Sequence, residues 1–356
     1  MIGFHTLILA LVLATPASAQ VKTCPSGAAT QTITIAGSTT VEPIAKAWGA
    51  AYKAQCGTTV TVTGGGSSDG AKRVCGVTSA GTAVDIGAMS RPWKTTEATV
   101  STGGFTYQCV IGTRPKAIQI DVAIDGIVVI LKKDSLPQKC IAALGCLTFD
   151  QLRWIFSSYT RAGLLANGWS ASALANSDGN DKTHLYSELS KSCPAAEIKL
   201  TGPTSVFGTY TYFLETILTD YANGETFDTL RPSGAAYFGT TTDAATITRV
   251  GNDSTGNSIG YISYNAYSVI SNVRAISLKK KATNTCVAPS ATTIGTGTYP
   301  LSRRIYMNLL STTVAKTKLL IEYGMSVKGT ANVTATGFSP IPLVSRATMK
   351  SRLSIA

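Results

Sequence analysis

The sequence of 356 residues is long enough for two lobes of ordinary domain size, and its formal net charge of +12 favours anionic partners. Only 14% of the residues are charged, and no zinc-finger, helix-turn-helix or aromatic RNA-binding signature occurs, so we expect no nucleic-acid partner. No C-x-x-C motif is present, and His184 is the single histidine beyond the N-terminal segment. We therefore expect no metal site and no cofactor.

The N-terminal segment is typical of a secretory signal. An apolar core ends at Ala17-Ser18-Ala19, which predicts cleavage after Ala19, although the usual positive charges before the core are missing. No later apolar run reaches the roughly 20 residues that a membrane span needs, so we expect no integral membrane segment. The eight cysteines all follow the signal, and their even number predicts disulfides in a periplasmic or secreted protein.

Three strand–turn units come first in the chain after the signal. Short apolar runs are each followed by a turn rich in glycine and hydroxyl side chains: 33–35 by 37–43, 60–63 by 64–70, and 84–86 by 88–92. The first two turns lead into helical patterns at 44–55 and 71–75. Alternating strands and helices predict a parallel α/β sheet, in which all three turns meet at one edge.

The residue types in these turns fit an oxyanion. Glycine lets a ligand approach the backbone, and helix N-termini offer unpaired N–H groups. Serine and threonine add hydroxyl donors, and Arg91 adds a two-pronged charged donor. A single turn of this composition is ordinary for a helix start, but three in series favour a binding site.

The rest of the chain adds a fourth unit of the same kind. Residues 118–131 are expected to form one long or broken strand whose continuously apolar second half is buried. A helix is predicted over 147–156 with Thr148 as its N-cap, and a strand at 198–200 leads through the turn 201–209 into a helix from 210 to about 221. Further strands are expected at 259–264, 273–276 and 299–307, followed by an amphipathic helix at 314–323.

These motifs together resemble the PstS-type phosphate-binding proteins of ABC transporters, which have the type 2 periplasmic-binding-protein fold. The matching stretches follow the family's order and cover nearly the whole chain after the signal: Gly37-Ser38-Thr39-Thr40-Val41-Glu42-Pro43, Gly65-Gly66-Ser67-Ser68-Asp69-Gly70, Asp85-Ile86-Gly87-Ala88-Met89-Ser90-Arg91-Pro92, Asp125-Gly126-Ile127, 147–156, Gly208-Thr209-Tyr210, Ile259-Gly260-Tyr261 and Tyr299-Pro300-Leu301-Ser302-Arg303.

The resemblance implies an α/β fold of two lobes, joined by two crossover strands, with the ligand cleft between the lobes. Mapped onto this chain, residues 1–19 are the signal peptide, 20–120 plus 299–356 form lobe one, and 121–298 form lobe two. Four cysteines then fall in each lobe. We predict at least three disulfides, each within one lobe, with the pairing left open.

The resemblance also implies the ligand set. The first turn would bind phosphate through Thr39, Thr40, Val41 and Glu42, the second through Ser67, Ser68 and Asp69, the third through Ser90 and Arg91, and the fourth through Thr204, Gly208 and Thr209.

Several positions depart from the family pattern. Ser90 stands where many members have an aspartate, Phe207 where a ligand serine is common, and Pro203 where some have an arginine. Hydrogen phosphate needs an acceptor for its proton, which Asp69 or Glu42 could provide, although both could equally be helix N-terminal charges. With Pro203 unable to donate, Arg91 is expected to supply the main positive charge in the cleft.

The role of Arg91 has one alternative. Arg91 could instead pair with a carboxylate such as Asp85 or Asp69 and brace its own turn. Lys72 and Arg73 lie in the first turn of the second helix and could point away from the cleft.

We therefore expect a monomeric, non-enzymatic solute-binding protein that captures inorganic phosphate or a similar oxyanion, with an ABC permease as a further partner. One alternative is a secreted protein that has kept the fold for binding or a surface role and lost transport, in keeping with the glycosylation patterns Asn252-Asp253-Ser254 and Asn332-Val333-Thr334. The other is a serine hydrolase, because residues 66–70 match G-x-S-x-G. Such an enzyme needs a histidine base, and only His184 is available.

Overall fold

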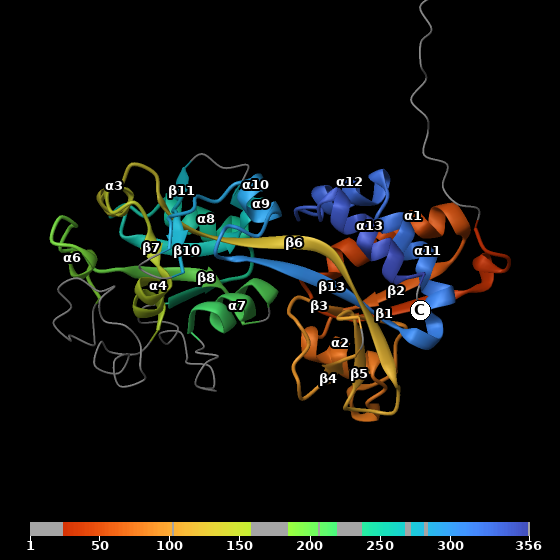
Figure 1. The fold of residues 1–356 in the computed structure, drawn as a ribbon. Helices are drawn as coiled ribbons and strands as arrows, with labels where there is room; N and C mark the ends of the chain where they lie inside the picture. Colours follow the sequence, from red (N-terminus) through yellow and green to blue (C-terminus); the bar gives the residue numbers. More distant parts are fainter. Residues whose placement is uncertain are drawn as a thin grey trace, which may run out of the picture.

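The computed structural model describes residues 24–101, 103–157, 184–205, 207–218, 237–267, 272–280 and 284–354 (Figure 1). The expected signal peptide, residues 1–19, lies outside the described residues. Figure 1 shows two α/β lobes on either side of two long strands that run from one to the other. The predicted two-lobed α/β fold is confirmed.

A single sheet of 11 strands runs through the described part of the molecule, in the order β2-β1-β3-β13-β6-β10-β8-β9, with β4, β5 and β11 beside this path. Its strands are β1 (Thr32–Gly37), β2 (Thr59–Thr63), β3 (Ile86–Met89), β4 (Ala98–Val100), β5 (Thr106–Cys109), β6 (Lys116–Lys132), β8 (Lys199–Pro203), β9 (Tyr237–Thr240), β10 (Ser258–Ser263), β11 (Val273–Ala275) and β13 (Ser302–Leu310). A separate pair consists of β7 (Leu147–Thr148) and β12 (Leu278–Lys279). As predicted, β1 runs parallel to both β2 and β3.

The strands β6 and β13 connect the lobes. The first half of β6 pairs with β13, and its second half pairs with β10 and β11 in lobe two. β6 is one continuous strand of 17 residues, buried along nearly all its length, which accounts for the continuously apolar sequence of its second half. A register shift between Ile305 and Tyr306 in β13 marks an irregularity in the crossover pairing. The lobe boundaries at 120 and 299 stay a prediction.

Helices cover the sheet in both lobes: α1 (Glu42–Cys56), α2 (Ser67–Val74), α3 (Leu136–Ala143), α4 (Phe149–Phe156), α6 (Tyr186–Leu189), α7 (Gly208–Phe213), α8 (Asp243–Gly251), α9 (Tyr264–Tyr267), α10 (Ala291–Gly295), α11 (Val314–Gly324), α12 (Val327–Ala335) and α13 (Leu343–Arg352). The predicted cap of α4 is confirmed, because Thr148 and Gln151 form a capping box. After α7 the chain continues as a π-helical turn, Leu214–Leu218.

Some boundaries differ from the sequence-based expectation. The second helix begins at Ser67 rather than Ala71, since Ser67-Ser68-Asp69 itself makes the first turn. The polar passage at 94–115, for which no strands were expected, contains the hairpin of β4 and β5. The tail contains α12 and α13, which were not predicted; α13 has an exposed polar sequence with a weak apolar pattern.

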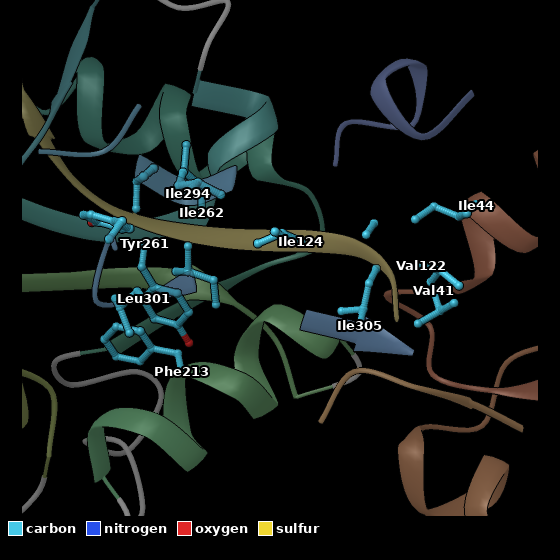
Figure 2. Packing of buried hydrophobic residues seen from close by; sticks show 14 of the residues in the cluster. Val41, Ile44, Val122, Ile124, Phe213, Tyr261, Ile262, Ile294, Leu301 and Ile305 are labelled. Atoms are coloured by element: carbon cyan, nitrogen blue, oxygen red, sulfur yellow. The ribbon is translucent and has the colours of Figure 1, made fainter. Parts of the chain in front are cut away.

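The core is built from aliphatic and aromatic side chains on both faces of the crossover. Figure 2 shows one group in lobe two and one in lobe one, with Ile124 of β6 between them. In lobe two, Phe213 stacks on Tyr261 with ring centroids 3.9 Å apart, which attaches α7 to β10. In lobe one, Ile44 of α1 is fully buried, so α1 is held with its N-terminus at the edge where the turns meet.

Four disulfides form within the described residues: Cys24–Cys56, Cys75–Cys109, Cys140–Cys193 and Cys146–Cys286. Each joins two cysteines from the same predicted group of four, so the prediction of disulfides inside each group is confirmed. None of these four disulfides connects the two groups, and none of them involves a cysteine in the crossover strands β6 and β13.

Candidate functional site

The first three turns meet at one edge of the sheet, as expected from their strand–turn–helix pattern. The Ser38 N–H donates to Ala88 O at 2.9 Å, and the Gly66 N–H donates to Gly37 O at 2.9 Å. Gly37 has φ of +133°, and a Cβ there would lie 2.2 Å from Ala88 O and 2.8 Å from the Cα of Gly70. The turns are therefore in backbone contact, and only glycine fits at their meeting point.

Two predicted ligand residues, Ser67 and Ser90, contact one another. The Ser90 N–H donates to Ser67 Oγ at 3.0 Å, and the two hydroxyl oxygens are 3.2 Å apart. Ser90 is buried, and Ser67 begins α2. In the first turn, the Thr40 N–H donates to Ser38 Oγ at 3.2 Å. The Ser67–Ser90 contact thus joins the second and third turns through their side chains, and the Thr40–Ser38 bond braces the first turn internally.

The two acidic residues expected near the ligand pair along their own helices. Glu42 Oε1 lies 2.6 Å from Lys46 Nζ, and Asp69 Oδ2 lies 3.7 Å from Arg73 Nη1. Both acids occupy the first turn of a helix. This geometry favours helix N-terminal charges over a proton acceptor for the ligand.

Arg91 is held by a carboxylate in its own turn, though not by either of the expected partners. Its two terminal nitrogens donate to both oxygens of Glu97, at 2.8 and 2.9 Å. Arg91 Nη2 also donates to Ser68 Oγ at 2.9 Å. Asp85 pairs instead with Lys316, and Asp69 with Arg73. The expected partners were wrong because Glu97 lies six residues along an irregular turn whose path the sequence does not indicate.

Arg303, which lies in the sequence motif 299–303 and had no predicted role, contacts residues of this edge. It lies on β13 opposite Asp125 of β6, and its Nε and Nη2 atoms donate to Asp125 Oδ2 at 3.1 and 3.0 Å. Its Nη1 donates to Ser90 O at 2.9 Å, and its Nη2 to Thr40 Oγ1 at 3.3 Å. Arg303 thus joins the first and third turns to the crossover strands.

The fourth turn leaves β8 and enters α7 in lobe two. The Thr204 N–H donates to Thr240 O at 3.0 Å, and the Phe207 N–H donates to Thr204 O at 3.1 Å. Phe207 is the N-cap of α7, where it offers no side-chain oxygen. Gly208 and Thr209 are the first residues of the helix whose Tyr212 lies over the Arg303 guanidinium, 4.1 Å from its centre. Through Tyr212, the helix that follows the fourth turn therefore contacts Arg303, which joins the first and third turns.

The charges at this edge come from both lobes. Burial raises the pKa of Glu215, just after α7, while the positive charges of Arg91, Arg303 and Lys94 counteract the rise. Burial also raises the pKa of Asp125, and the attraction of Arg303 opposes it. The two arginines are thus each paired with an acid, Arg91 with Glu97 and Arg303 with Asp125.

The residues needed for a serine hydrolase are not brought together. Ser68 Oγ accepts from Arg91. His184 is buried in lobe two, where its ring stacks on Trp154 with centroids 4.0 Å apart. The described ranges also contain no group of three or more residues able to hold a metal ion, and none of their helices is long and apolar enough to cross a bilayer.

Two α/β lobes joined by crossover strands, with donor-rich turns at the junction, define a two-lobed solute-binding fold. A model of the PBP superfamily domain matches residues 23–326, and the chain belongs to that family. No curated protein matches the sequence.

Solved structures similar to this chain include the following three. A possible phosphate-binding protein from Planctomyces limnophilus is 23% identical, with a TM-score of 0.62 over 91% of this chain and 98% of that one. An ABC-type phosphate transport receptor from Vibrio cholerae is 21% identical, with a TM-score of 0.59 over 87% and 100%. PstS from Borrelia burgdorferi is 18% identical, with a TM-score of 0.56 over 88% and 99%. At these identities the likeness establishes the fold.

Proposed function

We propose that the protein captures inorganic phosphate, one ion per chain, at the junction of its two lobes. The observation that carries this proposal is the convergence of three donor-rich turns: backbone hydrogen bonds join the first turn to the second and third, and the Ser67–Ser90 contact joins the second to the third. Such a set of donors, at the starts of α1 and α2, suits a tetrahedral oxyanion. Two of the structural neighbours, whose names mention phosphate, support the same ligand.

The proposed ligand set is the one predicted from the sequence. Thr39, Thr40 and Val41 contribute from the first turn, and Ser67 and Ser68 from the second. Ser90 and Arg91 contribute from the third, and Thr204, Gly208 and Thr209 complete the site from lobe two. Glu42 and Asp69 contribute through the helix starts on which they lie and not as acceptors, given their pairing with Lys46 and Arg73.

We propose further that the protein acts after export, without its signal peptide, and delivers phosphate to an ABC permease as a monomer without catalytic activity. The four disulfides fit an oxidising compartment outside the cytoplasm. The pairing of Ser68 with Arg91, together with the burial of His184 against Trp154, supports a binding role over hydrolysis.

Calorimetric titration of the purified protein with phosphate, arsenate and sulfate tests the proposal. We expect heat from phosphate with one ion bound per chain, and a higher melting temperature, since a ligand at a hundred times its Kd adds about 2.7 kcal/mol to the free energy of unfolding. Neither heat nor a thermal shift with phosphate would overturn the proposal. In that case the fold serves another ligand or a surface role.

A further inference from the structure

Arg303 lies where the two lobes meet. Its strand, β13, pairs with β6 in the crossover, and Arg303 stands opposite Asp125 in that register. The side chain of Arg303 is 8% exposed and that of Asp125 is 4% exposed. A charge pair this deeply buried holds its geometry, because either partner alone would be a costly unpaired charge.

The edges of the Arg303 guanidinium are occupied by neighbours in lobe one and the crossover. Of the five N–H donors that a guanidinium has, four make hydrogen bonds to Asp125, Ser90 and Thr40. These bonds hold the third turn through its backbone and the first turn through a hydroxyl. Arg303 therefore orients residues of the proposed phosphate site, and its remaining capacity for the ligand itself is small.

The face of the same guanidinium is covered from lobe two. The ring of Tyr212 lies 4.1 Å from the guanidinium carbon, within the range of a cation–π contact. Tyr212 stands four residues after Gly208 and three after Thr209 on α7, so the three residues share one face of that helix. Phe213, the next residue, is anchored in the core of lobe two by its stack on Tyr261.

We infer that Tyr212 and Arg303 form an interlobe clamp that couples closure of the cleft to the arrangement of the phosphate-binding turns. The inference rests on the proposed function for its ligand, and its geometry holds independently of that ligand. When lobe two approaches, Tyr212 docks on Arg303 as Gly208 and Thr209 reach the cleft. Arg303 acts as a positioning residue, since it holds Thr40 and Ser90 in register for the ion that closure encloses.

The proposed clamp requires the aromatic face of Tyr212, so substitutions at this residue can distinguish it from apolar packing alone. Tyr212→Phe keeps the ring and loses only the hydroxyl, whereas Tyr212→Leu keeps apolar volume and loses the π face. Tyr210, two residues earlier on the same helix, is a matched position that is also partly buried. Tyr210→Leu therefore removes a ring from α7 without removing the clamp.

The test combines small-angle X-ray scattering of the unliganded proteins with calorimetry using inorganic phosphate. We expect Tyr212→Leu to have a larger radius of gyration than the parent and to bind phosphate about five- to thirtyfold more weakly, the range for loss of a partly desolvated cation–π contact. Tyr212→Phe and Tyr210→Leu are expected to scatter like the parent, and Tyr212→Phe to bind phosphate within about twofold of it.

The two proposals fail in different ways. If the parent binds no phosphate but Tyr212→Leu alone is more extended, the clamp stands and the phosphate proposal falls. If Tyr212→Leu scatters like the parent, or if Tyr212→Phe is as extended as Tyr212→Leu, the clamp is overturned whatever phosphate does. Melting curves of all three variants ensure that only folded protein is compared.

Discussion

The turns of lobe one and the turn of lobe two differ in how they are held. In lobe one, three turns contact one another through backbone hydrogen bonds and the Ser67–Ser90 pair, and Arg303 joins two of them. In lobe two, the fourth turn is held by β8, β9 and the core beneath α7, and it reaches the others through Tyr212. Under the proposed function, lobe one would provide a prebuilt half-site and lobe two the approaching half-site that closes on it.

The largest effect is expected where the two halves join. Arg303→Ala leaves Asp125 buried without its cation, so we expect the free energy of unfolding to fall by roughly 3–5 kcal/mol. The matched control is Lys46→Ala, which breaks an ion pair whose lysine is 61% exposed and should cost about 1 kcal/mol or less. Urea unfolding of the two variants measures both losses in the free energy of unfolding. Equal losses would mean that the Arg303–Asp125 pair does not hold the junction.

A pH-dependent effect is expected in lobe two. Burial, with the nearby charge of Asp125, raises the pKa of Asp243 to about 6, despite a hydrogen bond from the Ser263 backbone. Because the folded-state pKa lies above the ordinary value, protonation of Asp243 stabilises the folded protein. This stabilisation is complete below about pH 4 and is lost as the pH rises through about 6.

Asp243→Asn should therefore gain stability relative to the parent between pH 4 and 7, by at most about 3 kcal/mol. Urea unfolding across this pH range checks the difference. A stability difference that does not change with pH would show that Asp243 titrates normally in the folded protein.

The two half-sites should respond differently to the loss of one hydroxyl. Ser67→Ala removes the acceptor of the buried Ser90 N–H, so we expect a loss of about 1–3 kcal/mol in stability together with roughly tenfold weaker phosphate binding. Thr209→Val, at the approaching half-site, should weaken phosphate binding by a similar factor with little change in melting temperature. Calorimetry and melting curves measured together decide this, and equal destabilisation by both variants would remove the distinction between the halves.

The smallest effect concerns the charge of Arg91. If Arg91 supplies charge to the ligand, Arg91→Ala should bind phosphate more than about threefold more weakly, whereas Glu97→Gln should bind it severalfold more tightly because the guanidinium is no longer neutralised. If Arg91 only braces its turn, both variants weaken binding. Calorimetry at low and moderate salt separates these two roles of Arg91, since the effect of its charge on phosphate binding falls with ionic strength.

Much of the fold and half of the site follow from local sequence. The pattern of β-branched runs, glycine turns and helix starts predicts that the first three turns meet, because strand order within parallel units is strongly constrained. The Thr148 cap could also be predicted from local sequence, since the capping pattern spans only four residues.

What the sequence could not indicate is long-range register. Arg303 and Ser90 are 213 residues apart, and their contact depends on which residue of β13 faces Asp125 in the crossover. Glu97 was not expected as the partner of Arg91 for a similar reason, because it lies in an irregular turn. The weak apolar pattern of α13, most of whose residues are exposed, left that helix unpredicted.

Hydrogen exchange with and without phosphate tests whether both lobes hold one phosphate ion. We expect phosphate to slow amide exchange at 38–41, 66–69 and 89–91 in lobe one and, in the same titration, at 207–210 in lobe two. Protection confined to lobe one, or absent from both sets of amides at saturating phosphate, would contradict capture between the lobes.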